Sequence, residues 1–136
     1  MIVDDEIFNI EAAKAILECR LNLKHVEQIC DSALNGQEAI QRVKENVQQN
    51  DDLFCNYHLI LMDCNMPVMD GYEASKEIRE YLQSKRLPQP AIIAVTGHTG
   101  ESYIKKAYQS GMNGVSQKPI DYLLLKDVLA RLQFLE

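Results

Sequence analysis

Polar side chains of a few types follow the apolar segments of this chain, each at the point where an apolar segment stops. They are three carboxylates, one hydroxyl and one amine, namely Asp4, Asp5, Asp63, Thr96 and Lys118. Crowded carboxylates repel one another, and Mg²⁺ is commonly held by one or two carboxylates together with a phosphate. If these side chains meet, their types suit Mg²⁺ and a phosphoryl group, with Lys118 and Thr96 on the oxygens that the metal leaves free.

One carboxylate of such a cluster can itself attack the phosphoryl group and become an aspartyl phosphate. Catalysis of phosphoryl transfer consists mainly of positioning and of charge neutralisation. A metal, an amine and a hydroxyl around one aspartate meet both needs. The residue types therefore predict phosphoryl transfer to an aspartate.

Each of these residues, taken singly, also has a structural explanation. Asp4, Asp5 and Thr96 are of types that cap helices, and Asp63 is of a type that starts turns. A single lysine such as Lys118 usually lies in solvent. The functional interpretation depends on the joint pattern, in which polar residues of the required types close several apolar segments.

The apolar segments predict an alternating α/β chain. Continuous apolar runs at 59–62 and 91–95 are typical of strands buried on both faces, and shorter strands are predicted at 2–3, 25–30 and around residue 115. Alternating strands and helices indicate one domain with a parallel sheet and right-handed crossovers. Ligands of such sheets bind at the carboxyl ends of the strands, where the polar residues would converge.

Five apolar stripes at helical spacing separate these strands, and we expect each stripe to face the core. The stripes are Phe8, Ala12, Ala15 and Ile16; Ala39, Ile40, Val43 and Val47; Ala74, Ile78, Tyr81 and Leu82; Ile104, Ala107 and Tyr108; and Leu125, Val128, Leu129 and Leu132. The polar stretch 48–57 is expected to be a loop.

Composition excludes several classes of protein. The 136 residues are 46% apolar and 25% charged, as in a globular domain. The net charge of −6 argues against direct nucleic-acid binding, which needs a positive surface. No apolar run approaches the roughly 20 residues of a membrane span, so we expect no membrane contact. Four scattered cysteines and an acidic start, unlike a secretory leader, favour a reduced chain in the cytoplasm.

The chain resembles the receiver domains of two-component response regulators from Ile2 to Leu135. The motifs that carry the resemblance are Val3-Asp4-Asp5, the segment 61–71 (LMDCNMPVMDG), Ala94-Val95-Thr96-Gly97, and Gly111-Met112-Asn113 leading to Lys118-Pro119-Ile120. The last of these is similar to receivers of hybrid sensor histidine kinases. The resemblance implies a flavodoxin-like (βα)5 doubly wound parallel sheet with strand order 2-1-3-4-5. We expect residues 1–136 to form a single receiver domain taken from a longer chain.

The resemblance also implies a metal site and a phosphoacceptor. Asp63 matches the aspartate that accepts the phosphoryl group. Asp4 and Asp5 match the acidic pair that holds Mg²⁺, and Asn65 matches the position whose backbone carbonyl ligates the metal. No organic cofactor is implied.

Further positions implied by the resemblance lie on the later strands. Thr96 matches the switch hydroxyl, Lys118 the lysine that pairs with the phosphate, and Pro119 the family's cis-peptide position. Val115 departs from the family, which often has an aromatic switch residue there. A valine cannot swing between a buried and an exposed position as an aromatic ring can.

The resemblance implies a signalling module of a phosphorelay. Its partner would be a histidine kinase or a histidine phosphotransfer protein, whose phosphohistidine donates to Asp63. Such a domain is not classed as an enzyme, although it assists its own phosphorylation and dephosphorylation. The sequence leaves its oligomeric state, its kinase and its output open.

Three alternatives make different demands on the sequence. An aspartate-nucleophile phosphatase of the haloacid-dehalogenase type needs a second acid two residues after the nucleophile, where this chain has Asn65. A flavodoxin-like nucleotide or flavin binder needs a phosphate-binding loop after the first strand, where this chain has Asp4-Asp5-Glu6. The third alternative is a receiver that only docks partners and is never phosphorylated.

Overall fold

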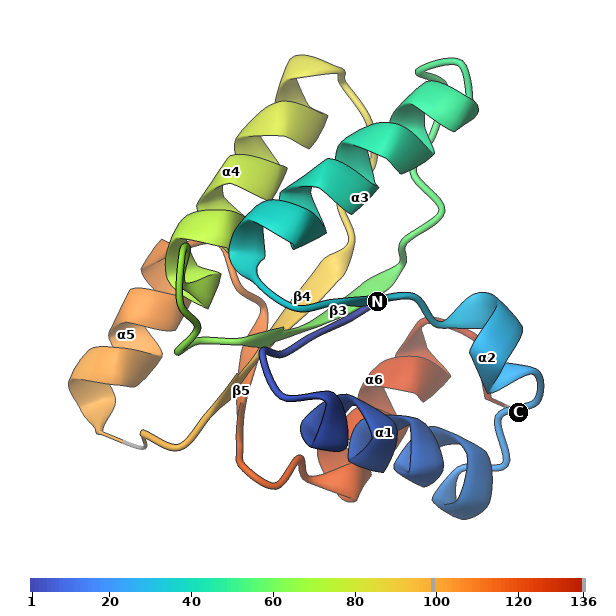
Figure 1. The fold of residues 1–136 in the computed structure, drawn as a ribbon, viewed down its shortest axis with the longest axis vertical. Helices are drawn as coiled ribbons and strands as arrows, with labels where there is room; N and C mark the ends of the chain where they lie inside the picture. Colours follow the sequence, from blue (N-terminus) through green and yellow to red (C-terminus); the bar gives the residue numbers. More distant parts are fainter. Residues whose placement is uncertain (99, 136) are drawn as a thin grey trace.

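Five parallel strands form one sheet with helices on both faces (Figure 1). The computed structural model describes residues 1–98 and 100–135, so positions 99 and 136 of the predicted domain lie outside the described residues. The strands are β1 (Ile2–Val3), β2 (Ser32–Ala33), β3 (Leu59–Asp63), β4 (Ala91–Thr96) and β5 (Gly114–Gln117). Their spatial order is β2-β1-β3-β4-β5, which confirms the predicted doubly wound topology.

The helices are distributed over the two faces of the sheet. In chain order they are α1 (Ile7–Ala15), which continues into a π-helical turn η1 (Ile16–Arg20), then α2 (Val26–Ile29), α3 (Gly36–Gln49), α4 (Gly71–Ser84), α5 (Glu101–Gln109) and α6 (Tyr122–Arg131). Helices α3, α4 and α5 pack on one face, and α1 and α6 pack on the other (Figure 1). Helices α3, α4 and α6 start at aspartate or asparagine N-caps whose side chains accept backbone N–H bonds.

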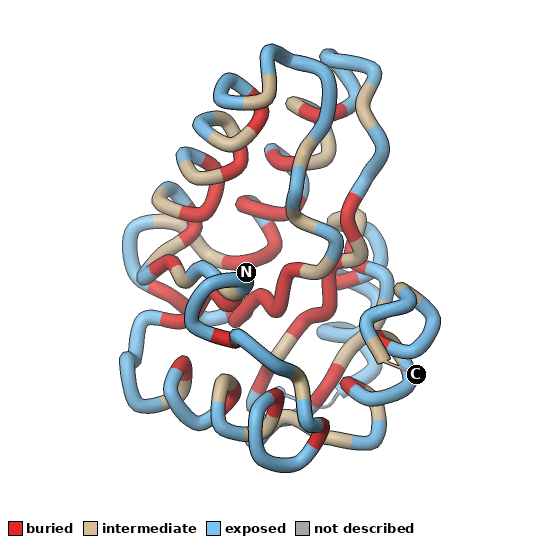
Figure 2. The backbone as a smooth tube through the Cα atoms, turned by 90° about the vertical axis from the view of Figure 1, so that its right-hand side faces the viewer, coloured by how far each residue is buried: buried red, intermediate tan, exposed pale blue. Residues whose placement is uncertain are grey.

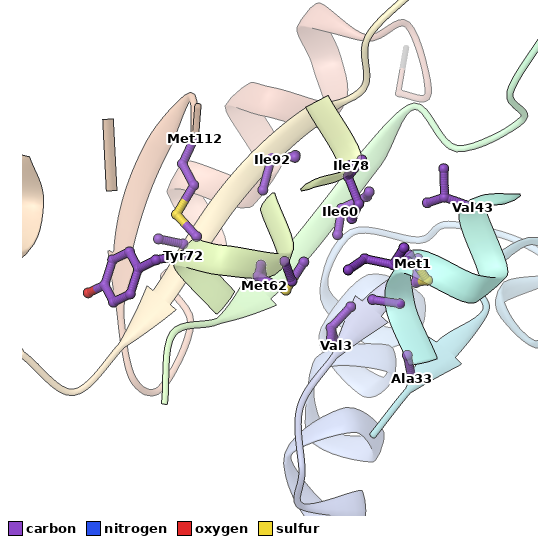
Figure 3. Close-up of a cluster of buried hydrophobic side chains, with 14 of the residues drawn as sticks. Met1, Val3, Ala33, Val43, Ile60, Met62, Tyr72, Ile78, Ile92 and Met112 are labelled. Atoms are coloured by element: carbon purple, nitrogen blue, oxygen red, sulfur yellow. The ribbon is translucent and has the colours of Figure 1, made fainter. Parts of the chain in front are cut away.

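Successive residues of the central strands point to opposite faces, and both faces are buried. Ile60 and Met62 join the cluster under α3 and α4, whereas Leu61 joins the cluster under α1 and α6. Figure 3 shows Ile60, Met62 and Ile78 gathered with Ile92 in the first of these clusters. Figure 2 shows the buried residues running through the sheet between exposed helix surfaces. The prediction that the continuous apolar runs are buried on both sides is confirmed.

The strand predicted at 25–30 is wrong. Val26–Ile29 forms the short helix α2, and the second strand is Ser32–Ala33. His25 has a φ of 61°, in the left-handed region, so the chain turns there instead of extending. The apolar run contributes one buried side chain, Val26, while Ile29 is exposed, because only one side of this turn contacts the core.

Two of the helical stripes do not face the core as predicted. Helix α1 buries Ile10 and Ala13 instead of the stripe that starts at Phe8, which is 80% exposed. In α5, Ala107 is buried but Ile104 and Tyr108 are exposed. The stripes of α3 and α4 do line the core, as predicted. Apolar spacing therefore located the helices more reliably than it located their buried sides.

Candidate functional site

The carboxyl ends of β1 and β3 bring three aspartates together. Val3 lies in register with Met62 on the neighbouring strand, so the residues that follow them, Asp4 and Asp63, are side by side. Carboxylate oxygens of Asp4, Asp5 and Asp63 all lie within 4.8 Å of one another. The predicted convergence of acids from distant parts of the chain is confirmed.

Asp63 is almost completely buried, with 1% of its surface exposed. Its Oδ1 accepts a hydrogen bond from the backbone N–H of Asn65 at 3.1 Å, which starts the following turn. Its Oδ2 is buried and makes no hydrogen bond among the described residues, although Lys118 Nζ lies 3.0 Å away as an ion-pair partner. Asp63 thus turns one oxygen to the backbone and the other to the ammonium group.

The start of α4 packs directly against Asp63. A Cβ on Gly71 would overlap the backbone oxygen of Asp63, so no larger residue fits there without movement. The N–H of Gly71 donates to the carbonyl of Cys64 at 3.1 Å. These contacts fix the backbone on both sides of the aspartate.

Asp4 divides its oxygens in the same way. Its Oδ1 accepts from the backbone N–H of Glu6 at 2.9 Å and from Asn9 Nδ2 at 3.3 Å, and its Oδ2 lies 3.8 Å from Lys118 Nζ. The N-cap of α1 is Glu6 and it has no side-chain cap, so Asp4 does not cap the helix as its residue type alone would suggest; its Oδ1 holds the N–H of Glu6 just before the helix. Asp5 is exposed, so its carboxylate lies at the solvent side of the cluster.

In the ion pair of Asp63 and Lys118, burial and the opposite charge of the partner shift each pKa in opposite directions. Burial raises the pKa of Asp63, and the pKa stays raised although Lys118 and the Asn65 N–H favour the charged form. Burial by itself would lower the pKa of Lys118, but Asp63, Asp4 and Asp5 outweigh it and leave that pKa raised. The site thus has more acidic than basic groups, and its donors are oxygens, which is the set that a hard divalent cation prefers.

Thr96 and Lys118 come from the next two strands. Thr96 is 2% exposed, and its Oγ1 accepts from the backbone N–H of His98 at 3.0 Å. Lys118 donates its backbone N–H to the carbonyl of Thr96 at 2.9 Å, and the Lys118–Pro119 peptide bond is cis, as the resemblance implied. The structure joins Lys118 directly to two of the acids, whereas the Thr96 hydroxyl contacts the loop that leads to α5.

Comparison with known families identifies this arrangement. The model of the response regulator receiver domain matches residues 1–130. The chain belongs to this receiver family. A receiver domain is a signalling module, and the parallel sheet with acids at its carboxyl edge is the architecture described above.

Individual relatives are similar over nearly the whole receiver. The osmosensing histidine protein kinase SLN1 of Saccharomyces cerevisiae is 37% identical over 129 residues, which cover 95% of this chain but 10% of that protein. The receiver domain of the histidine kinase CKI1 from Arabidopsis thaliana, solved with Mg²⁺, superposes with a TM-score of 0.78 at 29% identity and covers 96% of this chain and 88% of that one.

A further solved structure contains a receiver with a partner. It is the co-crystal structure of the Saccharomyces cerevisiae histidine phosphotransfer signaling protein Ypd1 with the receiver domain of the response regulator Ssk1. Its TM-score is 0.74 at 30% identity, and the match covers 98% of this chain and 89% of that one. The chain spans about a tenth or less of the length of the first kinase relatives that it matches.

Sequence reasoning missed some residues of the receiver site. Asn9 and Glu6 hold Asp4, and the sequence alone does not single them out. Gly71 belongs to the motif 61–71, but its close approach to Asp63 is visible only in the structure. An amide in the first turn after an acidic pair is the one signal that pointed to Asn9. The ring of His98 stacks on that of Tyr103, with 4.5 Å between the ring centroids, and no sequence pattern predicts this contact.

Three further observations concern Cys64, Val115 and the lengths of the helices. Cys64 is fully buried next to Asp63, and burial raises the pKa of its thiol to about 11, so the thiol stays protonated at neutral pH and is a poor nucleophile. Val115, at the usual position of the aromatic switch, is half-buried. Among the described residues, none of the helices has the length and apolar character needed to cross a bilayer.

Proposed function

We propose that Asp63 accepts a phosphoryl group from a phosphohistidine of a partner protein. The observation that carries this proposal is the buried Asp63 Oδ2, which lies 3.0 Å from Lys118 Nζ inside a cluster of three carboxylates. Asp63 Oδ2 would form the new O–P bond while the P–N bond to the imidazole breaks. The adjacent Asn65 N–H keeps the other oxygen in place during the transfer.

Mg²⁺ fits the donor set of this site. The carboxylates of Asp4, Asp5 and Asp63 would hold it, and the resemblance adds the backbone carbonyl of Asn65. When bound, the ion offsets the negative charge of the carboxylates and of the phosphoryl oxygens.

Two further side chains, at the ends of β4 and β5, would contact the phosphoryl oxygens. Lys118 is placed to pair with a phosphoryl oxygen, because its ammonium group already faces Asp63 Oδ2. The Thr96 hydroxyl would leave the His98 N–H for another phosphoryl oxygen, which would move the loop before α5. In this way the domain assists its own phosphorylation and dephosphorylation and changes the surface that partners contact.

The partner we propose is a histidine kinase or a histidine phosphotransfer protein. Support comes from the relatives, which include hybrid histidine kinases and a receiver solved with the phosphotransfer protein Ypd1. We place the exchange in the cytoplasm, where the four cysteines would stay reduced.

The alternatives receive less support. A phosphatase of the haloacid-dehalogenase type would need an acid at position 65, and Asn65 is there, with its backbone N–H used to hold Asp63. A nucleotide or flavin binder would place its phosphate where Asp4 and Asp5 present negative charge. A receiver that only docks partners would have no need for the pair between Lys118 and the buried Asp63.

Intact-mass measurement after incubation with acetyl phosphate and Mg²⁺ tests the proposal. We expect the wild type to gain one phosphoryl group and Asp63→Asn to gain none. Asp70→Asn is the matched control, because Asp70 caps α4 in the same loop and asparagine caps equally well; it should be phosphorylated like the wild type.

Two results would contradict the proposal. One is a wild type that gains no phosphoryl group at any Mg²⁺ concentration. The other is label that persists in Asp63→Asn. Steady turnover of a generic phosphate ester would instead favour the phosphatase.

A further inference from the structure

The side chain of Asn9 lies between two carboxylates at the start of α1. Its Nδ2 donates to Asp4 Oδ1 at 3.3 Å and is 3.4 Å from Glu6 Oε2. Asn9 is half-buried, and the same Asp4 oxygen also accepts from the backbone N–H of Glu6. A neutral amide thus separates two acids and fixes the orientation of one of them.

The orientation of Asp4 matters because Lys118 is shared. Its Nζ lies 3.0 Å from Asp63 Oδ2 and 3.8 Å from Asp4 Oδ2. Two carboxylates compete for one ammonium group, and the nearer one is the proposed phosphoacceptor. Asp4 Oδ1 accepts from the Glu6 N–H and from Asn9, so a movement of its Oδ2 toward Lys118 would disturb those hydrogen bonds.

We propose that Asn9 is a positioning residue, which holds the Asp4 carboxylate in the orientation that binds the divalent ion and keeps Lys118 on Asp63. This inference rests on the proposed function. Hydrogen bonds to ligating carboxylates commonly set metal affinity, and their loss typically costs tenfold or more. Asn9 donates to Asp4 and Glu6 and, in the part of the chain that the structure describes, forms no hydrogen bond with Asp63, so it acts through Asp4.

Isothermal titration of MgCl₂ into Asn9→Leu, without any phosphodonor, tests this role. Leucine has a similar size and lacks the amide donor, and we expect its Mg²⁺ dissociation constant to rise about tenfold. Asn9→Ser, whose hydroxyl is too short to replace the amide, should show the same loss. Gln48→Leu is the matched control, since it exchanges an exposed amide in the last turn of α3, at the end of that helix away from the carboxyl edge, and should bind like the wild type.

Phosphorylation by acetyl phosphate at increasing Mg²⁺ separates positioning from a general structural effect. For both Asn9 variants, we expect half-saturation to move to about tenfold higher Mg²⁺ while the rate at saturating Mg²⁺ stays near that of the wild type. A rate that falls equally at all Mg²⁺ concentrations would overturn the positioning role.

The outcomes distinguish the two proposals. A wild type that binds no Mg²⁺ would refute the metal site of the proposed function. A wild type that binds Mg²⁺, together with Asn9 variants of the same affinity, would refute only the role of Asn9. Thermal unfolding of each variant verifies that the affinities refer to folded protein.

Discussion

The core under α3 and α4 differs from the carboxyl edge of the sheet in the kind of side chain that is buried. Under α3 and α4 the apolar residues are inside, as at Val43 and Ile78, which are 0% exposed. At the carboxyl edge, Asp4 and Asp63 are buried, while Phe8, in the helix that follows Asp4, is 80% exposed. Buried acids and exposed apolar side chains both cost stability or solubility, so this edge is not arranged for stability.

This contrast has a physical cause in each region. Helices α3 and α4 pack against each other and over the sheet, so a wide apolar stripe on each is needed to fill the space (Figure 1). At the carboxyl edge, the site needs charged oxygens close to one another and away from bulk water. A region that gathers buried acids next to one another departs from the usual inside-outside rule, and such a region is expected to be functional.

The largest effect should come from truncating an isoleucine under α4. Ile78→Ala removes a fully buried side chain and should lower the free energy of unfolding by about 4 kcal/mol. Ile104→Ala in α5 removes the same atoms where 37% of the residue is exposed, and should cost less than about 1 kcal/mol.

Urea unfolding of both variants measures this difference. Equal losses at Ile78 and Ile104 would show that the two helices do not differ in packing. The contrast between a filled core and an exposed stripe would then be wrong.

Sequence patterns correctly predicted the strands and helices whose apolar residues are buried in the core. The run 59–62 and the stripe that includes Ile78 are apolar because they are buried, so burial was readable from them. The prediction of a strand at 25–30 is wrong because these residues form one short helical turn, which starts after His25 in the left-handed region. A backbone turn that depends on one dihedral angle leaves no periodic trace in the sequence.

For the site, the sequence predicted which residues meet but not how their individual atoms are arranged. Asp4, Asp63 and Lys118 were found because the carboxyl ends of parallel strands share an edge. The division of each carboxylate between backbone and ammonium was not predictable, since it depends on rotamers and on Asn9. Residue types and topology thus define which groups meet, and side-chain packing decides which atoms face one another.

The cost of the buried acid gives the next largest effect. In Asp63→Asn a neutral amide replaces a carboxylate whose pKa is raised by burial. Below the ordinary pKa of a carboxyl group, folded and unfolded wild type both hold the proton and no penalty arises. As pH rises through the unfolded and then the folded pKa, ionisation of Asp63 lowers the stability of the wild type.

We therefore expect Asp63→Asn to be more stable than the wild type at neutral pH, by on the order of 1 kcal/mol, and equally stable in acid. Thermal or urea unfolding across pH, with EDTA present to exclude divalent ions, measures the difference. If Asp63→Asn is instead less stable at neutral pH, the Lys118 pair more than offsets the cost of burial, and the site does not conflict with stability.

The smallest effect is expected at Phe8, the most exposed large apolar residue among those described. Phe8→Ser removes an aromatic ring that lies mostly in water, so the free energy of unfolding should change by less than about 0.5 kcal/mol. Ile10→Ala is the matched control on the same helix, because Ile10 is 3% exposed, and it should cost about 3 kcal/mol. Urea unfolding of the two variants tests whether α1 uses the side that the structure shows. A large loss at Phe8 would mean that the ring packs in solution, and the contrast between the two regions would then hold only for the buried acids.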